Sequence, residues 1–212
     1  MSVARRDLKY RRIYRKYRDF TMVPESWYAG NLHLAERVKT LPGAIVECGT
    51  WRGGMIAGIA DILGPEREYY LFDSFAGLPA PKEIDGKAAF EWARNVKSPY
   101  YHDNCRASED EAIQAMKMSA GRKYKTIKGW FHETLPSVTL GPIALLRMDA
   151  DWYDSTKQIL DNLSGSVVPG GLILVDDYYV YEGCARAVNE CAASRNWMIR
   201  QYWRGDVCYV IT

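Results

Sequence analysis

The sequence predicts an α/β fold with a doubly wound sheet that is mostly parallel and has an antiparallel strand at its C-terminal end. Apolar, β-forming runs alternate with amphipathic stretches, which is typical of a parallel sheet wrapped by helices. Two of these runs end in pairs of acidic residues. The last two runs are separated by Arg204, Gly205 and Asp206, a spacing that predicts a hairpin with glycine in its turn.

The elements follow from local patterns of apolar and turn-forming residues. Strands are predicted at Ala44–Cys48, Glu68–Asp73, Tyr124–Lys128, Ile143–Asp149, Gly171–Asp176, Trp197–Trp203 and Val207–Thr212. Helices are predicted at Gly53–Leu63, Ser108–Ser119, Ser155–Leu163 and Gly183–Ala193. Three acidic residues follow Ser108, and this order suits a helix start because serine caps free N–H groups and acids complement the helix dipole.

The first 20 residues form a basic segment. They contain eight lysines and arginines against two aspartates, whereas the remainder of the chain is slightly acidic. Four apolar side chains are spaced to share one face of a helix: Tyr10, Ile13, Tyr14 and Tyr17. We therefore expect a helical arm over residues 1–40. Its apolar stripe is expected to pack on a partner subunit or to cover the site, and it favours a homodimer.

Length and composition limit the class of protein. The 212 residues predict one domain, residues 1–212, with a substantial core. No apolar run approaches the ~18 residues of a membrane span, and the basic start lacks the apolar segment of a secretory signal. The five cysteines are scattered and form no CxxC pair, which indicates reduced thiols in a cytoplasmic protein. The acidic remainder and the lack of a recognition motif argue against nucleic-acid binding.

Residues 76–107 interrupt the alternation of strands and helices. They contain Pro79, Pro81 and Pro99 and few strand signals. Because loops of this length in a compact domain are usually functional or disordered, we interpret the segment as a lid or acceptor-binding insertion. His102 lies within it and is a candidate catalytic residue, since a side chain in this segment can reach an acceptor.

Two acidic pairs follow neighbouring predicted strands. Asp149 and Asp151 end one apolar run, and Asp176 and Asp177 end the next. In an open α/β sheet, ligands bind outside the carboxyl ends of the strands, so both pairs are expected to face one crevice. Such a cluster repels itself unless a cation or a shared proton neutralises it. Oxygen ligands favour a hard ion such as Mg2+ over Zn2+.

A predicted strand that runs into a glycine-rich turn and then a helix indicates a cofactor site. The turn contains Gly49, Gly53 and Gly54, which let the backbone approach a ligand but do not follow the GxGxxG spacing of dinucleotide sites. Asp73 ends the next strand, where nucleotide-binding α/β folds hold a ribose diol. S-adenosylmethionine fits better than a dinucleotide, because its ribose and its positive sulfonium both suit an acid-rich edge.

Five segments resemble the macrocin O-methyltransferase (TylF/MycF-like) family of S-adenosylmethionine-dependent sugar O-methyltransferases. They occur in the family's order and are spread over residues 44–190, which is most of the chain: Glu47–Gly54, Asp73–Pro79, Gly129–Pro136, Arg147–Thr156 and Val175–Tyr178. The resemblance implies a class I methyltransferase (Rossmann-like) fold, S-adenosylmethionine, Mg2+ and methylation of a sugar hydroxyl.

The resemblance also implies roles for individual residues. By position, Asp149, Asp176 and Asp177 match the metal triad of the family. Asp151 matches its proposed general base, and on an extended strand end its carboxylate would face the same side as that of Asp149. Asp73 matches the ribose acid. With the glycine turn and the segment beside the adenine, the expected cofactor-binding residues are Glu47, Gly49, Thr50, Gly53, Asp73, Ser74, Gly129, Trp130 and Asp149.

Three features depart from the family pattern. His132 stands where we expect lysine, the N-terminal arm is short, and the chain stops at its last strand. The last two features leave the acceptor open, because arms and lids shape the acceptor pocket in such enzymes.

We therefore expect Mg2+-dependent methyl transfer to a sugar hydroxyl of a glycosylated natural product or of an oligosaccharide or polysaccharide precursor. A catechol-type O-methyltransferase is the alternative among enzymes, since it uses the same pairing of a diol with a metal. A non-catalytic module that binds S-adenosylmethionine or nucleic acid is the alternative of another class, and the intact acid cluster argues against it.

Overall fold

The computed structural model describes residues 3–203 and 207–212, so the predicted turn at Arg204–Asp206 lies outside them. The described residues form a seven-stranded sheet in the order β3-β2-β1-β4-β5-β7-β6. The strands are β1 Ala44–Cys48, β2 Glu68–Asp73, β3 Lys123–Lys128, β4 Ile143–Met148, β5 Val167–Val175, β6 Ile199–Tyr202 and β7 Val207–Ile211. The first five strands pair in parallel, and β7 runs antiparallel to both β5 and β6, as predicted.

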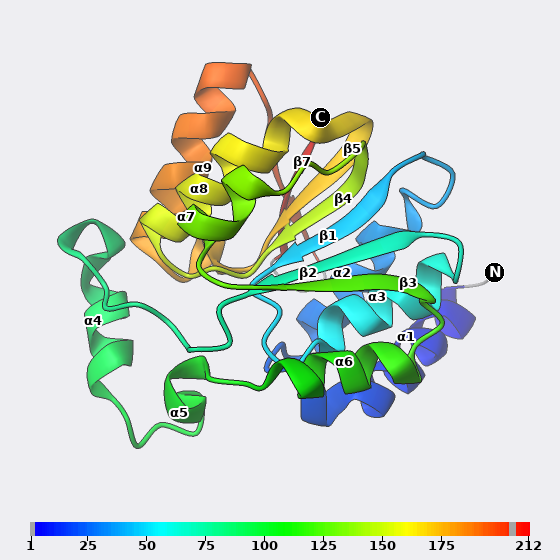
Figure 1. The fold of residues 1–212 in the computed structure, drawn as a ribbon, viewed down its shortest axis with the longest axis horizontal. Coiled ribbons are helices and arrows are strands. Elements are labelled where there is room, and N and C mark those ends of the chain that lie inside the picture. The colour runs from blue at the N-terminus through cyan, green and yellow to red at the C-terminus, as the bar shows by residue number, and fades with distance from the viewer. Residues whose placement is uncertain (1–2, 204–206) are drawn as a thin grey trace.

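Helices cover both faces of this sheet (Figure 1). One face carries α1 Val3–Tyr17, α2 Glu25–Glu36, α3 Gly54–Leu63 and α6 Glu109–Met118, and the other carries α7 Phe131–Thr134, α8 Tyr153–Leu163 and α9 Glu182–Arg195. Successive strand residues point to opposite faces. Thus Ile45 packs with the first helix layer, whereas Val46 packs with the second. Strands β1 and β4 lie between both layers and are buried at every position.

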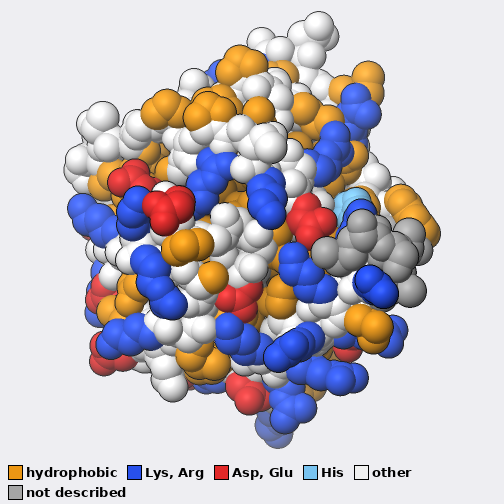
Figure 2. All heavy atoms as spheres, turned by 90° about the vertical axis from the view of Figure 1, so that its right-hand side faces the viewer, with side chains coloured by type: hydrophobic (Ala, Val, Ile, Leu, Met, Phe, Trp, Pro, Cys, Tyr) orange, Lys and Arg blue, Asp and Glu red, His pale blue; other side chains and the backbone are white. Residues whose placement is uncertain are grey.

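The basic arm docks on its own chain. The stripe residues Tyr10, Ile13 and Tyr17 are buried in the core layer that contains α2 and α3. An ion pair of 2.7 Å between Lys16 and Asp61 fixes the helix further. Figure 2 shows many basic side chains on the face that carries α1, with acidic side chains among them. The expectation that this stripe packs on a partner or covers the site is therefore wrong, and the stripe gives no support for a homodimer.

The insertion at residues 76–107 has structure of its own. It contains the short 3-10 helix η2 Glu83–Asp85, the helix α4 Gly86–Arg94 and the turn α5 His102–Cys105, and α4 and α5 stand apart from the sheet (Figure 1). All four residues of α5 have positive φ angles, a conformation that L-residues adopt reluctantly. The insertion is tied to the body where Asp85 accepts a hydrogen bond of 2.7 Å from the N–H of Tyr153.

All five cysteines are free thiols, and four of them are buried, so no disulfide frame exists. None of the described helices is both long and apolar enough to cross a bilayer.

Candidate active site

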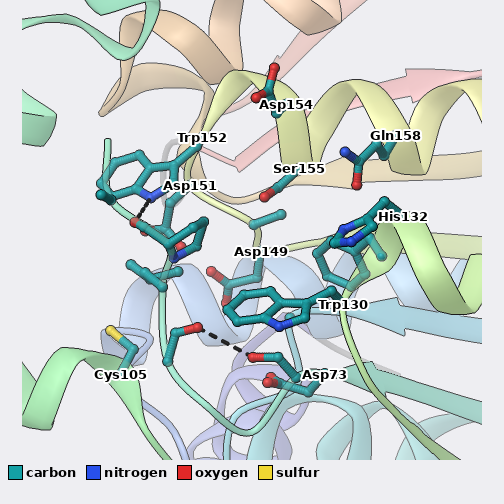
Figure 3. Close-up of a pocket in the computed structure, with 18 of the residues that line it drawn as sticks. Asp73, Cys105, Trp130, His132, Asp149, Asp151, Trp152, Asp154, Ser155 and Gln158 are labelled. Carbon is teal, nitrogen blue, oxygen red and sulfur yellow. Dashed lines mark hydrogen bonds between the residues drawn. The ribbon is translucent and has the colours of Figure 1, made fainter. Parts of the chain in front are cut away.

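A cavity of about 380 Å3 opens at the carboxyl ends of the parallel strands, where open α/β sheets bind ligands. Its wall is formed by residues that follow β1, β2, β3 and β4 and by the start of the insertion. Figure 3 shows Asp73 and Trp130 on one side of this opening and Asp151 and Trp152 on the other. Some residues of each predicted group, the cofactor residues and the acid cluster, therefore line one cavity, whereas Asp176 and Asp177 are not part of its wall.

The glycine turn after β1 brings two strand ends close together. Gly49 has a φ of +83°, and a Cβ atom there would lie 1.6 Å from the carbonyl oxygen of Asp149. The N–H of Asp149 in turn donates a hydrogen bond of 2.9 Å to the carbonyl of Cys48. Glycine is required at position 49 both for its backbone conformation and for this close approach.

Asp73 is held in place at the end of β2. Its two carboxylate oxygens accept hydrogen bonds of 2.7 Å from the N–H groups of Trp51 and Phe75. Burial raises the pKa of Asp73, while these backbone hydrogen bonds act in the opposite direction. Each oxygen of an ionised carboxylate has a further lone pair, so Asp73 can still accept the hydroxyls of a diol.

An aromatic side chain lies on the same side of the cavity as Asp73. Trp130 precedes α7, lines the cavity and exposes 36% of its surface. A flat and partly exposed ring of this kind suits stacking with a planar base. His132 follows on α7 and also lines the cavity, and Figure 3 shows it on the same side as Gln158 of α8. His132 and Gln158 add polar groups to the cavity wall.

Three acids meet beside this wall. Asp149, Asp151 and Asp177 each offer an oxygen atom, and these atoms lie within 4.8 Å of one another. The expectation that Asp151 sits on an extended strand end is wrong, because β4 stops at Met148 and Asp151 has a φ of +57°. The left-handed turn nevertheless brings Asp151 to Asp149 and Asp177.

The carboxylates of the cluster disfavour one another's ionised forms. Burial raises the pKa of Asp151 and of Asp177 well above the ordinary range, and the neighbouring carboxylates raise both values further. Burial and Asp176 raise the pKa of Asp149 to about 7, although Arg147 acts against them. Partly buried carboxylate oxygens that repel one another in this way fit a hard divalent cation such as Mg2+. The residues present are therefore compatible with the metal that the sequence predicts.

Asp176 makes a separate contact at the edge of this cluster. Its Oδ1 accepts a hydrogen bond of 2.7 Å from Nη2 of Arg147. Arg147 exposes only 1% of its side chain and also contacts Glu47 and Asp149. Our sequence reasoning did not assign a role to Arg147. The available signal was a cation inside the otherwise apolar run Ile143–Met148, where burial requires acidic partners.

The predicted cofactor residues divide into two groups. Six of them line the cavity: Gly49, Asp73, Ser74, Gly129, Trp130 and Asp149. The other three, Glu47, Thr50 and Gly53, are not part of its wall. Glu47 is buried against Arg147, and burial raises its pKa to about 8. The hydroxyl of Thr50 donates to the carbonyl of Phe72, and Gly53 precedes α3, so both residues shape the turn.

The predicted catalytic residues occupy different places. Asp151 lines the cavity, whereas His102 is not part of the wall and packs its ring 5.4 Å from that of Trp51. Cys105, on the same left-handed turn as His102, does line the cavity. Burial and the charges of the acid cluster raise the pKa of the Cys105 thiol, which keeps it protonated. Sequence reasoning missed Cys105 and Trp51, because no motif marks a side chain that a turn brings to the cavity.

Comparison with known proteins identifies relatives of this chain. Residues 20–200 match the family model described as macrocin-O-methyltransferase (TylF). Demethyldecarbamoylnovobiocin O-methyltransferase of Streptomyces niveus is 35% identical over 163 residues, which are 73% of this chain and 60% of that protein. The 8-demethyl-8-(2,3-dimethoxy-alpha-L-rhamnosyl)-tetracenomycin-C 4'-O-methyltransferase of Streptomyces olivaceus is 32% identical over 157 residues, 71% of this chain and 58% of that protein. The chain thus spans about three fifths of the length of these relatives.

Solved structures show the same architecture. The O-methyltransferase NovP superposes with a TM-score of 0.76 at 29% identity, over 91% of this chain and 81% of that structure. The calicheamicin methyltransferase CalS11 superposes with a TM-score of 0.66 at 18% identity, over 100% of this chain and 94% of that structure. The second likeness concerns the fold alone. Both neighbours have the Rossmann-like fold that the sequence predicts for this chain.

Proposed function

This chain belongs to the macrocin-O-methyltransferase (TylF) family, and from that membership we propose that it transfers a methyl group from S-adenosylmethionine to a sugar hydroxyl of a glycosylated small molecule, with Mg2+ as cofactor. The observation that carries the proposal is one cavity lined by Asp73, by Trp130 and by two acids of the cluster, Asp149 and Asp151. One relative is named as a demethyldecarbamoylnovobiocin O-methyltransferase, and the name of another specifies a rhamnosyl group on tetracenomycin C. The second name supports a sugar-bearing acceptor for this chain.

The cofactor wall has the groups that a positively charged nucleoside needs. Gly49 lines the cavity with backbone atoms alone, and Asp73 can accept hydrogen bonds from a ribose diol. Trp130 offers a ring face for the adenine. S-adenosylmethionine supplies a methyl group that is already activated by its sulfonium. The acidic neighbours of the cavity favour this positive charge.

The acid cluster is the part of the site that we assign to the acceptor. Following the family pattern, we assign Asp149, Asp176 and Asp177 to the metal and Asp151 to the general base. The contact of Asp176 with Arg147 uses one carboxylate oxygen and leaves the other for a ligand. When bound there, Mg2+ would lower the pKa of the acceptor hydroxyl and orient its oxygen.

The bond changes follow from these positions. The hydroxyl oxygen forms a bond to the methyl carbon as the carbon–sulfur bond breaks, and the sulfur leaves as a neutral thioether. Asp151 accepts the hydroxyl proton. Burial raises the pKa of Asp151, which makes its carboxylate a stronger proton acceptor than an exposed one. The cavity walls contribute by holding the two reactants in line.

An acceptor screen tests this function. The protein is incubated with S-adenosylmethionine and Mg2+ and with either glycosylated natural products, free oligosaccharides or catechols, and methylated products are measured by mass spectrometry. We expect methylation of a glycoside that stops in excess EDTA and returns when Mg2+ is restored. Methylation of catechols alone would favour the catechol-type enzyme. Binding of S-adenosylmethionine without transfer to any acceptor would favour a non-catalytic module.

A further inference from the structure

We propose that Arg147 is a positioning residue, which holds Asp149 and Asp176 in the orientation that binds the divalent cation. The proposal rests on the metal dependence proposed above and concerns a residue to which no role in the reaction has been given. Arg147 lies on β4, the central strand of the sheet, with only 1% of its side chain exposed. It is thus beneath the cavity and not part of its wall.

The guanidinium joins the ends of three adjacent strands. Nη1 contacts Oε1 of Glu47 at 2.9 Å and Oδ2 of Asp149 at 3.0 Å. Nη2 contacts Oδ1 of Asp176 at 2.7 Å. Glu47 belongs to β1, Asp149 follows β4 and Asp176 follows β5, which are neighbours in the sheet. One planar group therefore fixes the relative positions of acids from all three strands.

The orientation of the guanidinium is itself fixed from the opposite side. Nε donates a hydrogen bond of 3.3 Å to Oδ1 of Asn31, a fully buried residue of α2. The amide nitrogen of Asn31 donates to the carbonyl of Trp27, which sets the direction of the amide. All three nitrogens of the Arg147 guanidinium therefore have partners. Such a network leaves the plane of the guanidinium little freedom to turn.

Arg147 contacts only one carboxylate oxygen of Asp149 and one of Asp176. In the described part of the chain, Asp149 and Asp176 each use one oxygen on Arg147, and the other oxygen of each accepts no hydrogen bond. Those remaining oxygens are available to a cation. Arg147 contacts three carboxylates but carries one positive charge, so it cannot neutralise all of them once they are ionised. Groups that orient metal ligands in this way typically change metal affinity when they are altered.

A lysine at position 147 would distinguish the effect of the positive charge from the effect of the planar shape of the guanidinium. Lysine keeps one positive charge but lacks the planar fork with which arginine contacts several carboxylates at once. A purely structural role for Arg147 predicts that Arg147→Lys lowers stability and leaves the affinity for the metal unchanged. A positioning role predicts that the affinity for the metal falls in the folded variant.

Calorimetric titration of the folded protein with Mg2+ alone tests this difference. We expect Arg147→Lys to bind Mg2+ about 10- to 100-fold more weakly than the wild type. The matched control is Arg67→Lys. Arg67 lies at the opposite end of β2 and donates to the backbone carbonyls of Gly43, Val38 and Lys39. Its replacement therefore removes a similar set of guanidinium hydrogen bonds, none of which involves an acid. The control should bind Mg2+ as the wild type does, whatever its stability.

The outcomes separate the two proposals. Equal Mg2+ affinity of wild type and folded Arg147→Lys overturns the positioning role and leaves the proposed function standing. No Mg2+ binding by the wild type contradicts the metal dependence itself, and the positioning role is overturned with it. If Arg147→Lys does not fold, Asn31→Leu removes the partner of Nε, together with the bond from Asn31 to the carbonyl of Trp27, and keeps every charge. We then expect a loss of affinity of about threefold or more, and an unchanged affinity overturns the proposal.

Discussion

The backbone N–H of Asp151 donates a hydrogen bond of 3.0 Å to Oδ2 of Asp177. This bond joins the segment after β4 to the segment after β5, and it holds Asp151 in its left-handed conformation. A residue with a positive φ angle persists only where its surroundings favour it. The bond therefore fixes the acid that we propose as the base close to an acid that we propose as a metal ligand.

Asp73 is expected to determine the affinity for S-adenosylmethionine. Asp73→Ala should weaken binding by about 1–3 kcal/mol, the range for hydrogen bonds to a charged group, and calorimetry measures this loss. The matched control is Asp61→Ala. Asp61 also accepts a backbone N–H, that of Ala120, but it lies outside the cavity wall. An unchanged affinity in Asp73→Ala would remove Asp73 from the site.

The acid cluster should make the stability of the protein depend on both pH and Mg2+. Burial raises the pKa of Asp149 from its ordinary value of 3.8 to about 7, so the folded protein binds this proton more tightly than the unfolded chain does. Stability is therefore lost as pH rises from about 4 to about 7. Mg2+ should raise Tm more at about pH 8 than at about pH 5, because a cation replaces the lost protons. Equal gains at both pH values would argue against binding at this cluster.

Much of this site was predictable because strand ends follow from sequence. An apolar run followed by acids gives both the strand and the position of its carboxyl end, and parallel strands bring such ends together. Asp73 and Asp149 reached the cavity for this reason. The register at the tips, with Cys48 beside Met148 and Met148 beside Val175, shows how close the strand ends are.

Other features depend on contacts between distant segments and have no local signal. The network of Arg147 joins residues that are 29 and 100 positions away in the sequence. The left-handed turn of Asp151 depends on a hydrogen bond to Asp177. Sequence periodicity indicated the apolar stripe of the N-terminal arm but not which surface would bury it. Tertiary packing decided that question in favour of the chain's own core.

Only one part of the insertion is expected to move. Residues 79–85 are anchored, because Trp152 Nε1 donates to the carbonyl of Pro79 and Asp85 accepts from Tyr153. The turn His102–Cys105 has four consecutive positive φ angles and stands at the cavity edge, so we propose that it closes over the acceptor. Hydrogen exchange should be fast over residues 95–107 in the free protein and slower with cofactor and acceptor bound. The same exchange in both states would indicate a passive insertion.

Asp151 is expected to accept the proton of the acceptor hydroxyl. Asp151→Asn keeps the shape of the side chain and its backbone bond to Asp177 but removes the proton acceptor. We expect kcat to fall by about 10²–10⁴-fold, the range for a positioned base, with little change in affinity for S-adenosylmethionine. The control is Asp154→Asn, because Asp154 lines the same cavity and pairs with Lys82 on the insertion. This control should alter KM more than kcat. If Asp151→Asn retained a kcat close to that of the wild type, the base would have to be another residue, and His102 would be tested next.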